Sequence, residues 1–234
     1  MKILGVQVDE YSKNEIRQKV EASLRGEEFL TIATLNPEML LFAEKNSSYA
    51  KILNSFDLKI VDGFGLQLAG LFKFHREIAR FPGSDLAGFI LKKSLKENRR
   101  VALINKKGGL SNKRDLESKF GAIQGVDVFD VEMNSNYSQF AMQHLLKTEI
   151  LLVGLGAPEQ EKFIQAAKDK IPNLKLAIGV GGTLDFWSGK QKRAPRWMRK
   201  IGLEWLYRFC RQPKRYRRIF NAIIIFPFKV FIKN

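Results

Sequence analysis

Short apolar runs alternate along most of this chain with segments of helical periodicity, and this alternation restricts the fold more than any other feature. The apolar runs have the length and composition of strands, and they lie at 29–35, 58–63, 100–105, 126–132, 149–156 and 174–182. Helical patterns separate them at 37–46, 84–98, 111–119 and 158–171. Apolar strands separated by helices form mainly parallel sheets that are covered on both faces. We therefore predict an α/β fold in which helices flank a mainly parallel sheet.

Three positions carry signals for the start of a helix. Pro37 stands at the first turn of the segment 37–46, where a missing N–H breaks no helical hydrogen bond. Ser84 is a candidate N-cap for the segment 84–98, and Thr183 is a candidate cap for the residues after the last strand.

Positive charge is concentrated near the C-terminus. The formal net charge is +16, and the residues from Phe186 onward carry fourteen Lys or Arg and a single acid, whereas residues 1–185 carry a net charge of only +3. A localised anionic partner explains this distribution better than a uniformly basic surface does. We therefore divide the chain into a Rossmann-like catalytic core, residues 1–190, and a basic, aromatic C-terminal appendage, residues 191–234.

Several classes of protein do not fit this composition. One cysteine, Cys210, excludes an intramolecular disulfide, and two histidines far apart in sequence make a structural zinc site untenable. The first residues do not read as a signal peptide. The longest apolar run, 222–232, is shorter than a spanning helix and is interrupted by Pro227 and Lys229. These features predict a cytoplasmic protein, unless the appendage ties it to a surface.

Ligands of parallel α/β sheets bind beyond the carboxyl ends of the strands, which directs attention to the loops at 34–37, 62–65, 105–109, 154–158 and 179–185. The first motif there, "VDGFGLQLAG" at 61–70, places Asp62 at the end of a strand. Asp62 is either a turn residue, since Asp-Gly is favoured in turns, or a general base at the mouth of a site. Leu68 stands where a dinucleotide fingerprint has its third glycine, so the motif is weak evidence for NAD.

Two further loops join a glycine turn to a helix. In "VGLGAPEQEKF" at 153–163, Gly156 precedes a helix start that suits a phosphate or a sugar hydroxyl, and Gln160 would project near the ligand. In "IGVGGTLDFW" at 178–187, Gly181 and Gly182 allow a ligand to approach the backbone. On the pattern alone, a tight strand-to-helix turn without a ligand explains the first of these patterns better than a binding site does.

Motifs for metal-assisted or nucleophilic chemistry are missing from the sequence. It contains no GxxxxGK[ST] phosphate loop, no HExxH, no GxSxG and no Asp-x-Asp pair of the sort that holds a metal against a nucleotide diphosphate. If this protein handles a diphosphate, arginines rather than a divalent ion neutralise the charge. We therefore predict neither a metal site nor a cofactor.

The appendage combines aromatic and basic residues. A recurrence every four residues predicts an apolar stripe along one helix, formed by Trp197, Ile201, Trp205 and Phe209. Arg208, Arg215 and Arg218 are spaced so that they can share a face, although Pro213 must bend or restart the helix. Such a segment is typical of interfacial membrane binding, or it is a solvated face over a docked helix. Nucleic acid is not expected as a partner, because the core is close to neutral.

Taken in order, the motifs resemble a known family. The stretches "TLNPEM", "VDGFG", "RFPGSDL", "VGLGAPEQEKFI", "GVGGTLDFWSGKQKRAPRWMRKIGLEWLYR" and "QPKRYRR" run from about residue 30 to 218 and are similar to the WecG/TagA/CpsF glycosyltransferases. The resemblance implies an inverting, metal-independent transferase at the inner face of the bacterial plasma membrane. It would move a sugar, often of the N-acetylmannosamine type, from a UDP-sugar donor to an undecaprenyl-diphosphate-linked acceptor in the synthesis of teichoic acid, common antigen or capsule.

The same resemblance implies roles for individual residues. The catalytic aspartate of the family matches Asp62, and arginines of the appendage that complete the site match Arg208, Arg215 and Arg218. Residues that line the family's pocket match Thr34, Arg80 and Gln160, with Asn36 beside Thr34.

Two other classes of function remain as alternatives at this level. A non-enzymatic basic adaptor would bind membranes or nucleic acid through the appendage and would not need Asp62 or Gln160. A nucleotide-dependent oxidoreductase would need more regular glycine spacing than this chain has. The donor sugar, the acceptor sugar and the assembly into a homo-oligomer stay open.

Overall fold

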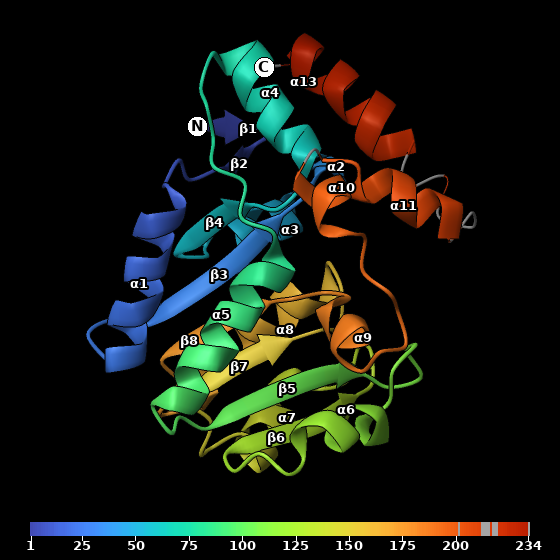
Figure 1. The fold of residues 1–234 in the computed structure, drawn as a ribbon. Coiled ribbons are helices and arrows are strands. Elements are labelled where there is room, and N and C mark those ends of the chain that lie inside the picture. The colour runs from blue at the N-terminus through green and yellow to red at the C-terminus, as the bar shows by residue number, and fades with distance from the viewer. Residues whose placement is uncertain (201, 212–215, 217–219, 234) are drawn as a thin grey trace.

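The computed structural model describes residues 1–200, 202–211, 216 and 220–233; of residues 200, 205, 208, 209, 211 and 233 it describes the backbone alone. Its centre is a six-stranded sheet in the order β4-β3-β8-β7-β5-β6 (Figure 1). All neighbouring strands in this sheet are parallel. The strands are β3 (Leu30–Leu35), β4 (Leu58–Val61), β5 (Val101–Lys106), β6 (Val126–Val131), β7 (Ile150–Val153) and β8 (Leu176–Gly179).

The predicted α/β fold with a mainly parallel sheet is therefore confirmed. The antiparallel part is a small separate hairpin, β1 (Lys2–Ile3) and β2 (Val6–Gln7), which the sequence patterns do not reveal. The four inner strands are buried along nearly their whole length, as continuous apolar runs covered on both faces should be.

Helices cover the two faces of the sheet in separate layers (Figure 1). One face packs against α1 (Lys13–Arg25), α5 (Gly83–Lys96), α6 (Lys113–Phe120) and the short α9 (Thr183–Trp187). The opposite face packs against α2 (Pro37–Lys45), α3 (Ser47–Asn54), α4 (Phe64–Phe74), α7 (Tyr137–His144) and α8 (Glu159–Ala167), which continues into the 3-10 turn η1 (Lys168–Lys170). Two apolar cores thus form, one on each side of the sheet.

One of the predicted helix starts is confirmed and two are wrong. Pro37 is the first residue of α2, as expected. Ser84 is not an N-cap, because α5 already begins at Gly83 and the Gly83 N–H donates to Asp62 Oδ1 at 2.8 Å. Thr183 lies inside α9, and its hydroxyl donates to the Val180 carbonyl at 2.6 Å instead of capping the helix. At Ser84 a tertiary contact takes the place of the local cap, whereas Thr183 bonds to a carbonyl three residues earlier in the chain.

The C-terminal region is helical but does not form one continuous helix before Pro213. It contains α10 (Arg196–Lys200) and α11 (Glu204–Arg211), separated by a turn at Gly202 with a φ of 80°. The predicted stripe from Trp197 to Phe209 is therefore wrong, because that turn changes the direction of the chain between its members; Ile201 lies outside the described residues. The division into residues 1–190 and 191–234 remains a prediction.

The last segment is also helical, as the π-helical turn η3 (Asn221–Ile225) followed by α13 (Phe226–Lys233). Pro227 does not interrupt α13, since it lies in its first turn. The side chains of Phe226 and Val230 are fully buried in the core on the α2 and α4 side of the sheet. Lys229 forms an ion pair with Glu44 of α2, and α13 lies beside α4 (Figure 1).

No helix among the described residues combines the length and the apolar character that crossing a membrane requires.

The burial of α13 predicts a strong contrast between two neighbouring phenylalanines. Phe226→Ala should lower the free energy that holds α13 in place by about 3–5 kcal/mol, because removal of a fully buried ring leaves a cavity. Phe228→Ala is the matched control, because its ring is 64% exposed and its loss should change stability by less than about 0.5 kcal/mol. Hydrogen exchange of the amides in 226–233 measures the effect, and equal protection in the two variants would contradict the packing described here.

Candidate active site

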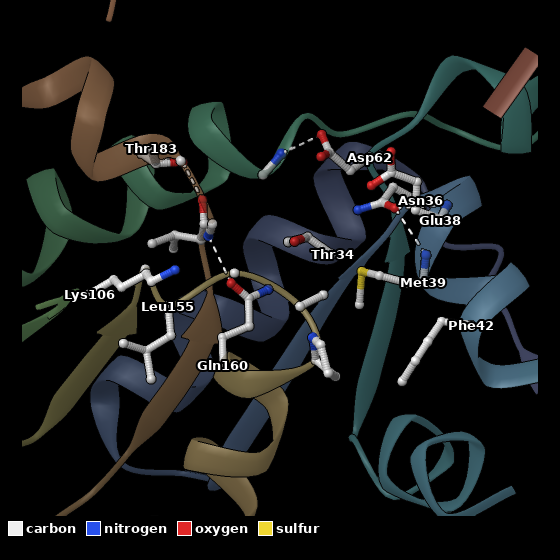
Figure 2. Close-up of a pocket in the computed structure, with 18 of the residues that line it drawn as sticks. Thr34, Asn36, Glu38, Met39, Phe42, Asp62, Lys106, Leu155, Gln160 and Thr183 are labelled. Carbon is white, nitrogen blue, oxygen red and sulfur yellow. Dashed lines mark hydrogen bonds between the residues drawn. The ribbon is translucent and has the colours of Figure 1, made fainter. Parts of the chain in front are cut away.

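A cleft of about 800 Å³ opens at the carboxyl edge of the sheet (Figure 2). Residues from all five predicted loops line it, namely 34 and 36, 62, 106 and 109, 154–158, and 180–183 with 185. The cleft is of the size of pockets that hold small ligands. The expectation that the ligand-facing loops meet at this edge is therefore confirmed by the geometry.

Asp62 directly follows β4 and stands at the rim of the cleft (Figure 2). Its carboxylate Oδ1 accepts the hydrogen bond from the Gly83 N–H, and its own N–H donates to the Leu35 carbonyl at 3.0 Å. Both the backbone and the side chain of Asp62 are thus held, the first by β3 and the second by the start of α5. A carboxylate fixed in this way is suited to act on a bound ligand.

Thr34 and Asn36 follow one another along the end of β3. The buried Thr34 hydroxyl donates to the Gly179 carbonyl at 3.0 Å, which ties β3 to β8. The side-chain oxygen of Asn36 caps α2 by accepting from the N–H groups of Glu38 and Met39 at 3.0 and 3.2 Å. Both residues line the cleft, and both also hold its wall in place.

Gln160 lies in the first turn of α8 and is only 3% exposed. Its side-chain oxygen accepts from the Gly181 N–H at 2.9 Å, so α8 holds the loop after β8 (Figure 2). Its side-chain nitrogen donates to Glu161 Oε1 at 2.7 Å. A Cβ on Gly179 would lie 2.5 Å from that nitrogen, so only glycine lets Gln160 reach this position.

Glu161 is fully buried beneath Gln160 and was not predicted. Its second oxygen accepts from the Tyr49 hydroxyl at 3.0 Å. Burial raises the pKa of Glu161 to about 7, against the opposing effect of the hydrogen bonds from Gln160 and Tyr49. Burial and the Glu161 charge likewise raise the pKa of Tyr49. The sequence holds one signal of burial in this turn. Residue 160 lies four and seven positions before the apolar residues Ile164 and Ala167, a spacing that places it on the buried face of the helix, next to Glu161.

Glu159, two residues earlier, behaves in the opposite way. Burial acts to raise its pKa, but hydrogen bonds from Lys162 and Tyr137, both 2.7 Å, outweigh burial and leave the pKa below its ordinary value. Burial raises the pKa of the Tyr137 hydroxyl to about 12. The first turn of α8 therefore carries one ionised carboxylate and one that titrates near neutral pH.

Arg80 does not line the cleft. It lines a second cavity on the other side of Asp62. Its guanidinium donates to the Arg199 carbonyl and lies 6.0 Å from the centre of the Phe64 ring. The backbone of Arg80 forms a bridge to Val61 at the end of β4. Arg80 thus connects β4 with α10.

The structure brings most of the predicted site residues together. Those that line the cleft are Thr34, Asn36, Asp62, Gly156, Gln160, Gly181 and Gly182. Arg208 lies on α11, with no description of its side chain, and Arg215 and Arg218 lie outside the described residues.

Sequence patterns missed three cationic side chains that line the cleft, Lys45 at the end of α2, Lys106 and Lys229. Lys106 ends β5, and Lys229 reaches the cleft from α13. The position of Lys106 at a strand end could have been noticed, whereas Lys229 is brought there only by the docking of α13. Among the described residues, no group of three or more His, Cys, Asp or Glu side chains is arranged to hold a metal ion.

Comparison with known proteins adds an independent finding. A model of the glycosyl transferase WecG/TagA/CpsF family matches residues 1–234. A protein of Bacillus subtilis (strain 168) named N-acetylglucosaminyldiphosphoundecaprenol N-acetyl-beta-D-mannosaminyltransferase is 29% identical over 218 residues, which are 92% of this chain and 81% of that protein. A protein of the same name from Staphylococcus aureus (strain MRSA252) is 27% identical over 237 residues, which cover 97% of this chain and 91% of that protein.

The buried Glu161 predicts a distinct dependence of stability on pH. The unfolded chain ionises at Glu161 near the ordinary pKa of 4.5, whereas the folded protein keeps the proton until about pH 7. The free energy of unfolding should therefore fall as the pH rises through this window, by up to about 1.4 kcal/mol per pH unit relative to Glu161→Gln.

Urea denaturation at several pH values between about 3 and 8 checks this prediction, because the Glu161 effect falls above pH 4.5 and the effect of a lowered pKa falls below it. Glu159→Gln serves as the matched control with the opposite sign, since a lowered pKa contributes stability that is lost as the pH falls. Parallel pH profiles for the wild-type protein and Glu161→Gln would show that Glu161 is not protonated in the fold.

Proposed function

Because the chain belongs to the WecG/TagA/CpsF glycosyl transferase family, we propose that it is an inverting, metal-independent glycosyltransferase. It moves a sugar, of the N-acetylmannosamine type, from a UDP-sugar to an undecaprenyl-diphosphate-linked sugar in the synthesis of a cell-surface polysaccharide. The names of the two relatives support the transferred sugar and the lipid-linked acceptor. The observation that carries the proposal is the position of Asp62, a carboxylate fixed between two cavities that can hold two substrates.

In the proposed reaction Asp62 takes the proton from a hydroxyl of the acceptor sugar. The oxygen forms a bond to the anomeric carbon of the donor sugar, on the face opposite the bond to UDP, and that bond breaks with its electron pair going to the diphosphate. One displacement of this kind inverts the configuration at the anomeric carbon. General base catalysis of the attack lowers the barrier because the nucleophile gains charge as the bond forms.

Negative charge grows on the leaving diphosphate, and the site must stabilise it. We assign this role to Arg208, Arg215 and Arg218, as the family resemblance implies, with Thr34, Asn36, Gly156, Gln160, Gly181 and Gly182 shaping the donor pocket and Arg80 placed on the acceptor side. Lys45 and Lys106 line the same cleft and add positive charge, and Lys229 lines it as the partner of Glu44. Cations held in place before the reaction stabilise developing charge without a metal ion.

A lipid-linked acceptor requires contact with a membrane. We propose peripheral association with the inner face of the bacterial plasma membrane, through the C-terminal helices. The support is a group of exposed apolar side chains on α13, namely Phe228, Phe231 and Ile232, in a region rich in Lys and Arg.

Removal of the proposed base tests the mechanism. Asp62→Asn should lower the turnover number about 10²–10⁴-fold, because the amide cannot accept the proton. The measurement is transfer of a radiolabelled sugar from a panel of UDP-sugars to a synthetic lipid-diphosphate-linked sugar. Unchanged melting temperature and unchanged donor affinity control for folding, and turnover close to that of the wild-type protein would exclude Asp62 as the base.

A second test addresses charge stabilisation without a metal. Arg208→Ala should lower the turnover number about 10²–10³-fold, by analogy with the loss of an oxyanion-hole donor. Arg114→Ala is the control for the loss of one positive charge, because Arg114 lies exposed on α6 and outside the cleft. The wild-type protein and Arg114→Ala should keep their activity in EDTA, and a strict requirement for a divalent ion would contradict the assignment of arginines.

A further inference from the structure

A second cavity of about 570 Å³ lies between α4 and the C-terminal segment, and its lining differs from that of the cleft. Its walls are mostly apolar. Leu68, Ala69 and Phe72 contribute from α4, and Ile223, Pro227 and Phe231 face them from η3 and α13. We call this cavity the α4–α13 groove.

The α4–α13 groove meets the cleft at Asp62. Both cavities are lined by Asn36, Glu38, Asp62 and Ser84, so a ligand in each would have one end at the same carboxylate. A transferase with a single base needs this arrangement, because the hydroxyl and the anomeric carbon must approach from different sides. The cleft supplies backbone amides and cations for a nucleotide sugar, which leaves the groove for the acceptor.

Two arginines lie at the walls of the groove. Its other polar lining residues are Glu204 and the four that it shares with the cleft. Arg80 contacts Phe64 at the inner end of α4. Arg193 pairs with Asp85 through Nη1 at 2.6 Å, but no acceptor among the described residues contacts its buried Nε and Nη2 atoms. Buried guanidinium donors without a partner are costly unless a ligand satisfies them, and a diphosphate is suited to do so.

At its outer end the groove reaches an exposed apolar surface. Phe72 and Phe231 line the groove and are 62% and 50% exposed. Leu71 of α4 and Phe228 and Ile232 of α13 are exposed as well. The Lys73 ammonium donates to the Phe231 carbonyl at 3.1 Å, which holds the two walls together. Figure 1 shows α4 and α13 running side by side away from the sheet. Apolar surface of this extent at the end of a groove indicates a lipid contact.

We propose that the α4–α13 groove binds the isoprenoid diphosphate part of the lipid-linked acceptor. The first isoprene units lie between α4 and α13, the diphosphate lies at Arg80 and Arg193, and the attached sugar reaches Asp62. The rest of the hydrocarbon leaves the groove between Phe72 and Phe231 and stays in the bilayer. This inference rests on the proposed function, and it assigns Arg193 and the walls of α4 and α13 to acceptor binding.

Two double variants test the groove against simple membrane docking. Phe72→Ser with Phe231→Ser removes one apolar side chain from each wall. Leu71→Ser with Phe228→Ser is the matched control, because it removes one exposed apolar side chain from each of the same helices but none from the groove. All four side chains are about half exposed or more, so both proteins should fold, which melting temperatures check.

Transfer is measured in detergent with two acceptors that carry the same sugar and diphosphate, one on an undecaprenyl chain and one on a single isoprene unit. The groove variant should raise the KM for the undecaprenyl acceptor at least about tenfold, given the apolar area that it removes. Its KM for the short acceptor and for the UDP-sugar should stay unchanged. The control variant should show the wild-type KM for all three, while binding less well to anionic phospholipid vesicles.

A binding measurement that needs no turnover completes the test. Farnesyl diphosphate should bind to the wild-type protein in calorimetry, more weakly to the groove variant and to Arg193→Gln, and unchanged to the control variant. Equal KM changes for the long and the short acceptor would overturn the proposal, as would a groove variant that affects only vesicle binding. If the wild-type protein transferred sugar to no lipid-linked acceptor, the proposed function would fail, and the farnesyl diphosphate titration would still decide whether the groove binds isoprenoid diphosphates.

Discussion

The parallel hydrogen-bond ladder through β4, β3, β8, β7 and β5 is the constraint on which the rest of the structure depends. Parallel strands all end at the same edge, so five loops that lie far apart in sequence must meet there. The cleft is the direct consequence, and it forms next to the central strands β3 and β8. Because these strands are buried on both faces, the loops are attached to a rigid frame and hold their polar groups in fixed positions.

The polar residues of the cleft serve the fold and the site together. Asp62 binds the start of α5, and Gln160 binds the loop after β8. Thr34 in turn binds the end of β8. Each of these side chains therefore arrives at the cleft already oriented by a neighbouring element, which reduces the reorganisation needed when a ligand binds. The same dual use means that their substitution must be controlled for stability before any change in activity is interpreted.

The C-terminal segment connects the chemistry with the membrane. α13 contributes Phe226 and Val230 to a core, Lys229 to the cleft and Phe231 to the groove. These contacts join α13 to the predicted core, and charge composition carries no information on such docking. If α13 leaves its place beside α4, one wall of the acceptor groove and a cation of the cleft are lost together. Coupling between membrane binding and activity would follow from that packing.

The sequence alone was sufficient for the α/β class, the positions of the six main strands and the loops that line the cleft, because buried strands and their terminal glycine and Asp-Gly turns have local signatures. It also identified the family, which the comparison confirmed. Only the tertiary structure decided the bond from Asp62 to the start of α5 at Gly83, the break at Gly202, the burial of Glu161 beneath Gln160 and the groove between α4 and α13. These features arise from contacts between residues distant in sequence, such as Tyr49 with Glu161 and Glu44 with Lys229, and no local pattern encodes which distant partner a side chain will meet.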